Sequence, residues 1–489
     1  MNKPWSLRHS FAVIFSVALL LAAFPPLHVR WLVFIGLVPW FLQLRTLNER
    51  GAAKSGFFFG FLYYVGQMTW LYPFVYKWTG NFFLPIFPLI IVGFLGAAYF
   101  SLQGWLIQRC YAARMPLMIP LIWAAVEIFR SYIPWLAFPW GLLATPLSLY
   151  PQIIQHAALG TIFLVSAWVV LVNLIFVQLI TKEKKTLVVG SSAVVFIFLV
   201  YSFIRYQHPP KTAEKKRIML GQIGVDMAFT PIPKMHQEIH ESIDKIFTLA
   251  KKENPDLLLL PEGLTHGGST IPPHTSFPYL PPVPTIFGGV RGDNPYYQAA
   301  FGYSHGHWQY EDKTRLVIFG EYVPFRNDIP FLKDFKLPSG NFTPGKTVKV
   351  FPMNHMIIGP IICFEELFPD IAYKQALMGA NLLAIMSIDD FFMGTAAIDQ
   401  LRDAAIWRAV ESGLPLGRCG SEGVTMAVDA RGNILAEAPI KIFDPMVVSM
   451  DLPRRSDAFL YRERFSWIAG AAAFWVVLAG LFTRRQKNN

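Results

Sequence analysis

The 489-residue chain has few charged residues and only three cysteines. Charged side chains make up 15% of it, whereas about 25% is usual in soluble domains. Cys110, Cys363 and Cys419 are too few for a disulfide framework. No Cys or His residues have the spacing of a zinc site, and the sequence contains no nucleotide-binding motif. We therefore expect neither a disulfide-stapled domain nor a metal or cofactor.

Apolar residues, in contrast, are abundant and make up 53% of the chain. A bilayer requires about 20 mostly apolar residues per helix. Seven such runs precede residue 207 and an eighth lies near the C-terminus. We predict a seven-span transmembrane domain at 1–207, a soluble domain at 216–455 and an eighth transmembrane helix at 465–483. The first seven runs lie at about 10–27, 31–47, 56–76, 83–108, 116–136, 160–181 and 186–205.

The net charge of +11 is compatible with nucleic-acid binding or with the basic loops of a membrane protein. The positions favour a membrane protein, because most basic clusters fall on one side if the spans alternate. That side is cytoplasmic by the positive-inside rule. Both termini are then cytoplasmic, and the soluble domain is periplasmic in a bacterium with an outer membrane. The clusters are Lys3 and Arg8; Arg45, Arg50 and Lys54; Arg109 and Arg114; Lys182, Lys184 and Lys185; Arg484, Arg485 and Lys487.

Two charges interrupt the apolar run at 116–136. A charge in hydrocarbon is costly, but Glu127 and Arg130 are three positions apart and can pair on one helix face. We favour a structural pair over a contact with substrate.

The segment 216–455 mixes helical and strand patterns. Residues 232–252 carry apolar side chains at the period of a helix, whereas 256–260 and 356–362 are continuous apolar runs typical of buried strands. The mixture predicts a layered α/β or α+β domain, for which two central sheets with outer helices is one arrangement.

Three polar residues stand at the ends of such segments. Glu262 and Cys363 each follow an apolar strand, and Lys313 precedes another apolar segment. Sites in α/β sheets form beyond the carboxyl ends of strands, and a thiol is activated by a base or a nearby cation. The pattern alone leaves other interpretations open: Cys363 as a packed hydrophobe, Glu262 as a turn cap and Lys313 as a solvated charge.

The sequence around these residues resembles the Glu-Lys-Cys triad of the nitrilase superfamily. The stretches "LLLLPEG", "YEDKTRLVIFGEYVPF" and "GPIICFEE" occur in that family's order. An insert of this type between seven spans and one span resembles the apolipoprotein N-acyltransferases, and "FPWGLLATP" extends the likeness into the first half. The resemblance implies a multi-pass α-helical membrane domain plus a nitrilase-like αββα sandwich outside the cytoplasm, in the bacterial inner membrane.

The resemblance also implies chemical roles. Cys363 would attack a phospholipid ester, with phosphatidylethanolamine the expected donor, and become an acyl-thioester. Glu262 would be the general base, Lys313 would hold the oxyanion, and Glu321 and Glu365 match the family's supporting acidic residues. The acceptor would be the α-amine of the N-terminal diacylglyceryl-cysteine of an apolipoprotein, in the last step of lipoprotein maturation. No nucleic acid takes part.

Aromatic residues and departures from the family pattern bear on the substrate. Phe138 and Trp140 either line a lipid access path or anchor helices at the membrane interface. Phe364, which stands where the family often has Tyr, is a third candidate for substrate binding. Ile388 and Phe391 replace the family's Asn and Trp. Three alternatives therefore stay open: a membrane-anchored nitrilase-type amidase, an N-acyltransferase with another donor or acceptor, and a non-catalytic membrane scaffold.

Overall fold

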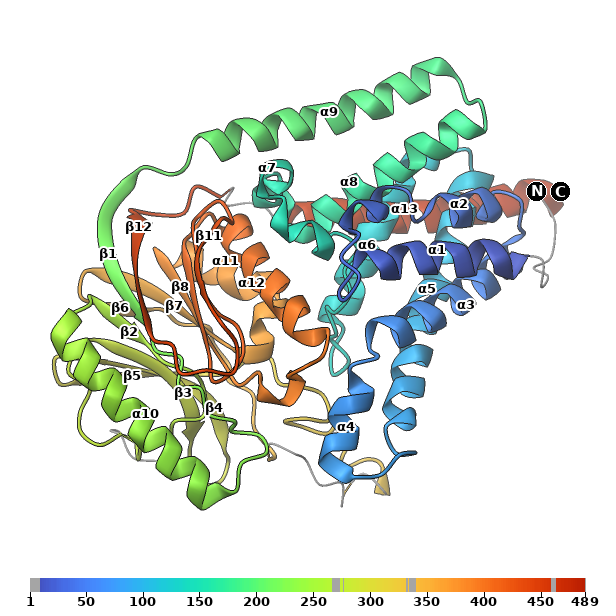
Figure 1. The fold of residues 1–489 in the computed structure, drawn as a ribbon. Helices are drawn as coiled ribbons and strands as arrows, with labels where there is room; N and C mark the ends of the chain where they lie inside the picture. Colours follow the sequence, from blue (N-terminus) through green and yellow to red (C-terminus); the bar gives the residue numbers. More distant parts are fainter. Residues whose placement is uncertain are drawn as a thin grey trace.

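A computed structural model of the chain describes residues 9–265, 273–275, 277–330, 333, 340–458 and 463–488. A half made of helices packs beside a half made of two sheets (Figure 1). Lys3 and Arg8, the first basic cluster, lie outside the described residues.

The helical half has helices in every apolar run predicted to span a membrane. Among the described residues, three helices are long and apolar enough to cross a bilayer: α5, α8 and α9. The run at 31–47 differs from the prediction, because a short 3₁₀ helix and α2 replace one continuous helix, and Pro39 stands in the first turn of α2, where its missing N–H costs nothing. The helices are α1 (Ser10–Ala23), η2 (Arg30–Phe34), α2 (Val38–Leu44), α3 (Glu49–Gln67), α4 (Leu71–Thr79), α5 (Ile86–Ala112), η3 (Pro116–Met118), α6 (Ile119–Tyr132), η4 (Thr145–Leu149), α7 (Pro151–Ile154), α8 (Ala157–Ile180), α9 (Lys185–Gln207) and α13 (Glu463–Asn488).

The other half is a sandwich of two six-stranded sheets, ordered β12-β1-β2-β3-β4-β5 and β11-β10-β9-β8-β7-β6. The neighbours β1-β2-β3 and β7-β8-β9 are parallel, and the other pairs are antiparallel. The strands are β1 (Thr212–Leu220), β2 (Leu257–Leu259), β3 (Thr285–Arg291), β4 (Tyr297–Ser304), β5 (His307–Asp312), β6 (Phe351–Met353), β7 (Met356–Ile362), β8 (Leu382–Ser387), β9 (Leu416–Gly420), β10 (Thr425–Val428), β11 (Ile434–Ala438) and β12 (Met446–Pro453).

Helices cover both outer faces of the sandwich (Figure 1). The apolar stripe of α10 (Ile232–Glu253), which includes Ile243 and Phe247, packs on the first sheet. On the second sheet lie α11 (Pro369–Leu377) and α12 (Ala397–Ser412). Because the central strands are buried on both faces, they read as continuous apolar runs. The expectation of two central sheets with outer helices is confirmed.

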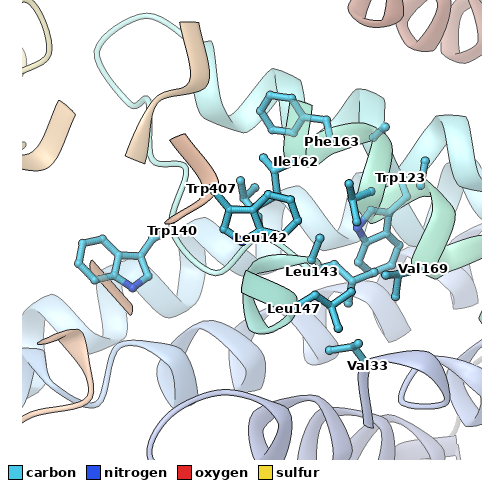
Figure 2. Packing of buried hydrophobic residues seen from close by; sticks show 14 of the residues in the cluster. Val33, Trp123, Trp140, Leu142, Leu143, Leu147, Ile162, Phe163, Val169 and Trp407 are labelled. Carbon is cyan, nitrogen blue, oxygen red and sulfur yellow. The ribbon is translucent and has the colours of Figure 1, made fainter. Parts of the chain in front are cut away.

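The helix α12 joins the sandwich to the helical half. Its buried Trp407 lies next to Leu142 and Ile162 (Figure 2). Asp403, also on α12, pairs with Arg30 of the helical half, with 3.0 Å between Oδ2 and Nη1 and both side chains almost fully buried. The sandwich is therefore held against the helices by both apolar packing and a buried ion pair.

Candidate active site

Three strand ends carry the residues of the predicted triad. Lys313 directly follows β5, Cys363 directly follows β7, and Glu262 stands shortly after β2. The charges of Lys313 and Glu262 both act on the Cys363 thiol, and those two residues also act on each other. The structure therefore brings the three side chains together, although they come from both sheets.

The backbone at Cys363 is in an unusual conformation. Its φ is +49°, in the left-handed region that residues other than glycine rarely adopt. Such a conformation costs on the order of 1–3 kcal/mol and persists only where the surroundings enforce it. Cys363 also opens the 3₁₀ turn η6 (Cys363–Leu367), directly after β7. Strain of this kind is common at nucleophiles and other functional positions.

Glu365 connects the end of β7, next to Cys363, to the segment that follows Lys313. Its Oε1 accepts hydrogen bonds from Thr314 N at 2.6 Å, Thr314 Oγ1 at 2.8 Å and Arg315 N at 3.1 Å. Its Oε2 accepts one from Ile362 N at 3.1 Å. Glu365 therefore holds the ends of β5 and β7 together.

Glu321 holds the lysine. Lys313 Nζ donates to Glu321 Oε1 at 2.7 Å, and Glu321 Oε2 accepts from Val317 N at 2.9 Å. Burial by itself lowers the pKa of Lys313, but the negative charges of Glu321 and Glu262 raise it above its ordinary value. Lys313 is therefore a buried ammonium ion next to the cysteine.

Glu262 is a buried carboxyl group with a raised pKa. Burial raises its pKa to about 7, the charge of Lys313 opposes this rise, and the charge of Glu321 adds to it. A pKa near the working pH suits a group that takes up and returns a proton. Gly288 on β3 makes room for it, since a Cβ there would lie 2.9 Å from Glu262 Cα.

The cysteine is a neutral thiol at rest. Burial raises the pKa of Cys363 to about 12, Lys313 lowers it, and Glu262 raises it. Because only a thiolate is strongly nucleophilic, the proton has to leave when the sulfur attacks. Glu262, with a pKa of about 7, is able to accept such a proton.

A buried ion cluster that the sequence did not reveal lies beside the turn of Cys363. Arg418 on β9 donates from Nε and Nη2 to Glu366 at 2.9 and 2.8 Å, and from Nη1 and Nη2 to Asp389 at 2.6 and 2.9 Å. The arginine and both carboxylates are inaccessible to solvent. Since Glu366 is in the turn of Cys363, the cluster fixes that turn to the ends of β8 and β9. No local sequence pattern indicates this cluster, because Asp389 and Glu366 are 29 and 52 positions from Arg418 in the chain.

A row of aromatic rings extends from the helical half to Phe364, the residue after Cys363. Phe138 stacks on Trp140, with centroids 6.0 Å apart, and lies 6.5 Å from Phe364. Trp140 is buried, and its Nε1 donates to Gln400 Oε1 on α12 at 2.5 Å. The three residues expected to bind substrate are therefore brought together, as a packed row of rings rather than as separate exposed anchors.

Arg130 supports this row from inside the helical half. Its Nη1 donates to Tyr64 Oη at 2.6 Å and to the carbonyl of Trp140 at 2.7 Å, and its Nη2 donates to Gly141 O at 3.1 Å. Glu127 lies 4.0 Å from Arg130 Nη2, so the expected pairing is confirmed. These contacts are structural, and they position the loop that carries Phe138 and Trp140.

The two departures in "SIDDFF" lie at the same end of the site. Phe391 packs against Phe74, Trp78 and Phe229, with centroids 5.8 to 6.4 Å apart. Ile388 lies close to the residue after Glu262, since a Cβ on Gly263 would lie 2.9 Å from its Cδ1. Ile388 is therefore an apolar neighbour of the Glu262 segment, and Phe391 belongs to a cluster of aromatic rings.

The sandwich and its strand ends define the class of protein. Residues 286–455 match the family model described as carbon-nitrogen hydrolase, so this half is a nitrilase-like enzyme domain. Residues 16–175 match the apolipoprotein N-acyltransferase N-terminal domain. With both matches in one chain, the protein belongs to the apolipoprotein N-acyltransferase family.

Curated relatives agree with this assignment. An apolipoprotein N-acyltransferase of Geobacter metallireducens is 26% identical over 98% of this chain and 96% of its own. One of Aquifex aeolicus is 28% identical over 84% of this chain and 92% of its own. Among solved structures, a carbon-nitrogen hydrolase from Helicobacter pylori is similar at a TM-score of 0.34 and 15% identity, covering 52% of this chain and 92% of that one. An amidase from Nesterenkonia sp. has a TM-score of 0.34 and 19% identity, covering 49% and 91%.

Proposed function

We propose that the protein transfers an acyl chain from a membrane phospholipid to the N-terminal amine of apolipoproteins through a thioester on Cys363. The observation that carries the proposal is the Cys363 thiol on a positive-φ strand end, electrostatically coupled to the base Glu262 and the buried cation Lys313. Family membership supports the choice of substrates.

In the first half-reaction, Cys363 Sγ attacks the ester carbonyl carbon of the phospholipid while Glu262 takes the thiol proton. The carbonyl oxygen becomes an oxyanion, which the ammonium of Lys313 stabilises. The carbon–oxygen bond to glycerol then breaks, and Glu262 returns its proton to the leaving oxygen. The lysophospholipid departs and an acyl-thioester remains. Phosphatidylethanolamine is the expected donor.

In the second half-reaction, the neutral α-amine of the diacylglyceryl-cysteine attacks the thioester carbon. Glu262 takes a proton from the amine, the carbon–sulfur bond breaks, and that proton returns to the sulfur of Cys363. The product is an amide. The covalent intermediate divides one difficult transfer into two easier ones.

The proposed setting is the inner membrane. Residues 1–207 would form seven spans, 216–455 the periplasmic catalytic domain and 465–483 the eighth span, with both termini cytoplasmic. The outward apolar surface of α9 supports this setting, since Phe196 and Ile197 are 65% and 63% exposed. Because both substrates are anchored in the bilayer, an embedded enzyme meets them at a high effective concentration.

The test is a search for the acyl-enzyme. Purified protein in detergent is incubated with phosphatidylethanolamine, and the Cys363 peptide is analysed by mass spectrometry. We expect an acyl adduct that hydroxylamine releases and that Cys363→Ala lacks. Cys110→Ala, which removes a buried cysteine of the helical half, is the matched control and keeps the adduct.

Addition of a diacylated lipopeptide then separates the alternatives. Transfer to its amine supports the proposed function. Release of free fatty acid with no amide product indicates a hydrolase of the amidase type, and transfer only to a different amine indicates another acceptor. Absence of any adduct with common phospholipids, in a folded protein, overturns the proposal.

A further inference from the structure

The strands β7 and β8 end side by side at the nucleophile. They are parallel, with Ile362 opposite Met386, so the next residues, Cys363 and Ser387, are neighbours across the two strands. Ser387 is fully buried, and while burial raises the pKa of the Cys363 thiol, the neighbouring Ser387 hydroxyl opposes that rise. The mechanism described above gives this serine no role.

The hydroxyl hydrogen of Ser387 points at rest toward the ion cluster. Ser387 Oγ donates to Asp389 Oδ1 at 2.7 Å. Asp389 is a carboxylate, because Arg418 and its other hydrogen bonds lower its pKa despite burial. Asp389 would remain well bonded without the serine: Oδ1 also accepts from Arg418 Nη2 at 2.9 Å, and Oδ2 accepts from Arg418 Nη1 at 2.6 Å and Val424 N at 3.0 Å.

The sulfur needs a donor only when it is charged. A serine hydroxyl has one hydrogen and can donate to one acceptor at a time. A neutral thiol is satisfied beside the oxygen lone pairs of Ser387, whereas a buried thiolate without a donor is costly. Lys313 Nζ gives one of its three hydrogens to Glu321, and in the proposed reaction its others serve the oxyanion, so a hydroxyl donor adds a directed bond to the sulfur.

We propose that Ser387 is a switching donor, whose hydroxyl rotates from Asp389 to the Cys363 sulfur when the sulfur becomes a thiolate. The S–H bond of Cys363 breaks and its proton goes to Glu262, while the Ser387 O–H bond stays intact throughout. The same rotation stabilises the thiolate that leaves when the amine attacks the thioester. The inference rests on the proposed role of Cys363 as nucleophile.

Several charged groups surround the sulfur, and the test has to separate the serine from them. They come from strand ends of both sheets, from the turn η6 and from β9. None of them changes in a serine variant. They are Glu262, Lys313, Glu321, Glu365, Glu366, Asp389 and Arg418.

The experiment measures alkylation of Cys363 by iodoacetamide as a function of pH, read on the Cys363 peptide by mass spectrometry. Ser387→Ala should slow alkylation near pH 8 by about tenfold, the effect of one hydrogen bond to a charged group, and move the profile to higher pH. Ser421→Ala is the matched control, because Ser421 is also buried and donates to a neighbouring carboxylate, Asp390. Its alkylation should stay within about twofold of the native rate, as expected for a change that leaves the sulfur's donor in place.

A second pair of variants covers the case in which Ser387→Ala does not fold. Ser387→Thr and Ser387→Val have the same shape and differ by the hydroxyl, so the threonine variant should react much faster than the valine variant. Equal rates in this pair, or equal rates for Ser387→Ala and Ser421→Ala, overturn the inference. Alkylation by iodoacetamide needs no phospholipid. If native protein forms no acyl adduct, the proposed function is refuted, and the comparison of alkylation rates between the serine variants can still be interpreted.

Discussion

The two sides of the candidate site are built differently. The polar side (Glu262, Lys313, Glu321, Cys363 and Glu365, with the ion cluster Glu366, Asp389 and Arg418) lies on strand ends and is held by short, directed hydrogen bonds. The aromatic side (Phe138, Trp140, Phe364, Phe391 and Phe392) lies where the sandwich meets the helical half and is held mainly by ring contacts.

The difference explains where this chain departs from its family's pattern. Directed bonds between buried charges fail when one partner is lost, whereas apolar contacts of similar volume can be exchanged at low cost. The exchanges at Phe364 and Phe391 fall on the aromatic side, the one at Ile388 lies beside the segment of Glu262, and Glu262, Lys313 and Cys363 are all present. If the proposed function holds, changes on the polar side should affect the chemistry and changes on the aromatic side the choice of substrate.

The largest effect is expected from Glu262→Gln. The amide cannot take the thiol proton, so the rate of adduct formation on Cys363 should fall by about 10³-fold, within the range for general acid–base catalysis. Mass spectrometry of the Cys363 peptide gives the rate. Glu241→Gln, on the exposed face of α10, is the control and should react like the native protein. An active Glu262→Gln enzyme would assign the base elsewhere.

Breaking the ion cluster should cost stability. Arg418→Met leaves Glu366 and Asp389 buried without their cation, so the free energy of unfolding should fall by about 3–5 kcal/mol. Arg402→Met removes a partly exposed pair with Glu437 and should cost less than about 1 kcal/mol. Denaturant titration compares the two. Similar losses of unfolding free energy in the two variants would mean that the buried ion cluster stabilises the fold no more than a surface ion pair does.

The pH dependence should report the state of Glu262. Its raised pKa of about 7 means that the carboxyl is protonated, and unable to act as a base, below that pH. Lys313 stays charged across this range because its pKa is raised. The single-turnover rate of adduct formation should therefore rise through pH 7 and fall about tenfold per unit well below it. A flat profile between pH 5 and 8 would contradict this assignment.

The smallest effect is expected on the aromatic side. Trp140→Phe keeps a ring but loses the hydrogen bond to Gln400, so acylation by phospholipid should slow by about threefold. Alkylation of Cys363 by iodoacetamide should not change, because the polar side is untouched. Trp467→Phe, at an exposed position on α13, is the control. An equal loss in alkylation would show that the two sides are not separable.

Much of the fold could be predicted from contiguous residues. The stripe at 232–252 predicted α10, and the apolar runs before Glu262 and Cys363 predicted β2 and β7. These elements can be predicted from the sequence because side-chain burial repeats with the period of the local backbone. The break in the run at 31–47 was not predicted, since hydropathy counts apolar residues and does not register a proline in the first turn of a helix.

By itself, the sequence determined which residues end strands, where apolar surface is concentrated and which family motifs are present. It thereby placed Glu262, Lys313 and Cys363 in the candidate site, and their catalytic roles stay predictions. Only the tertiary structure decided that Arg418 holds the turn of Cys363 and that Ser387 lies beside Cys363 across the ends of β7 and β8. The physical reason is that these contacts join strand ends far apart in the chain, whose neighbours are set by sheet order and register rather than by any local period.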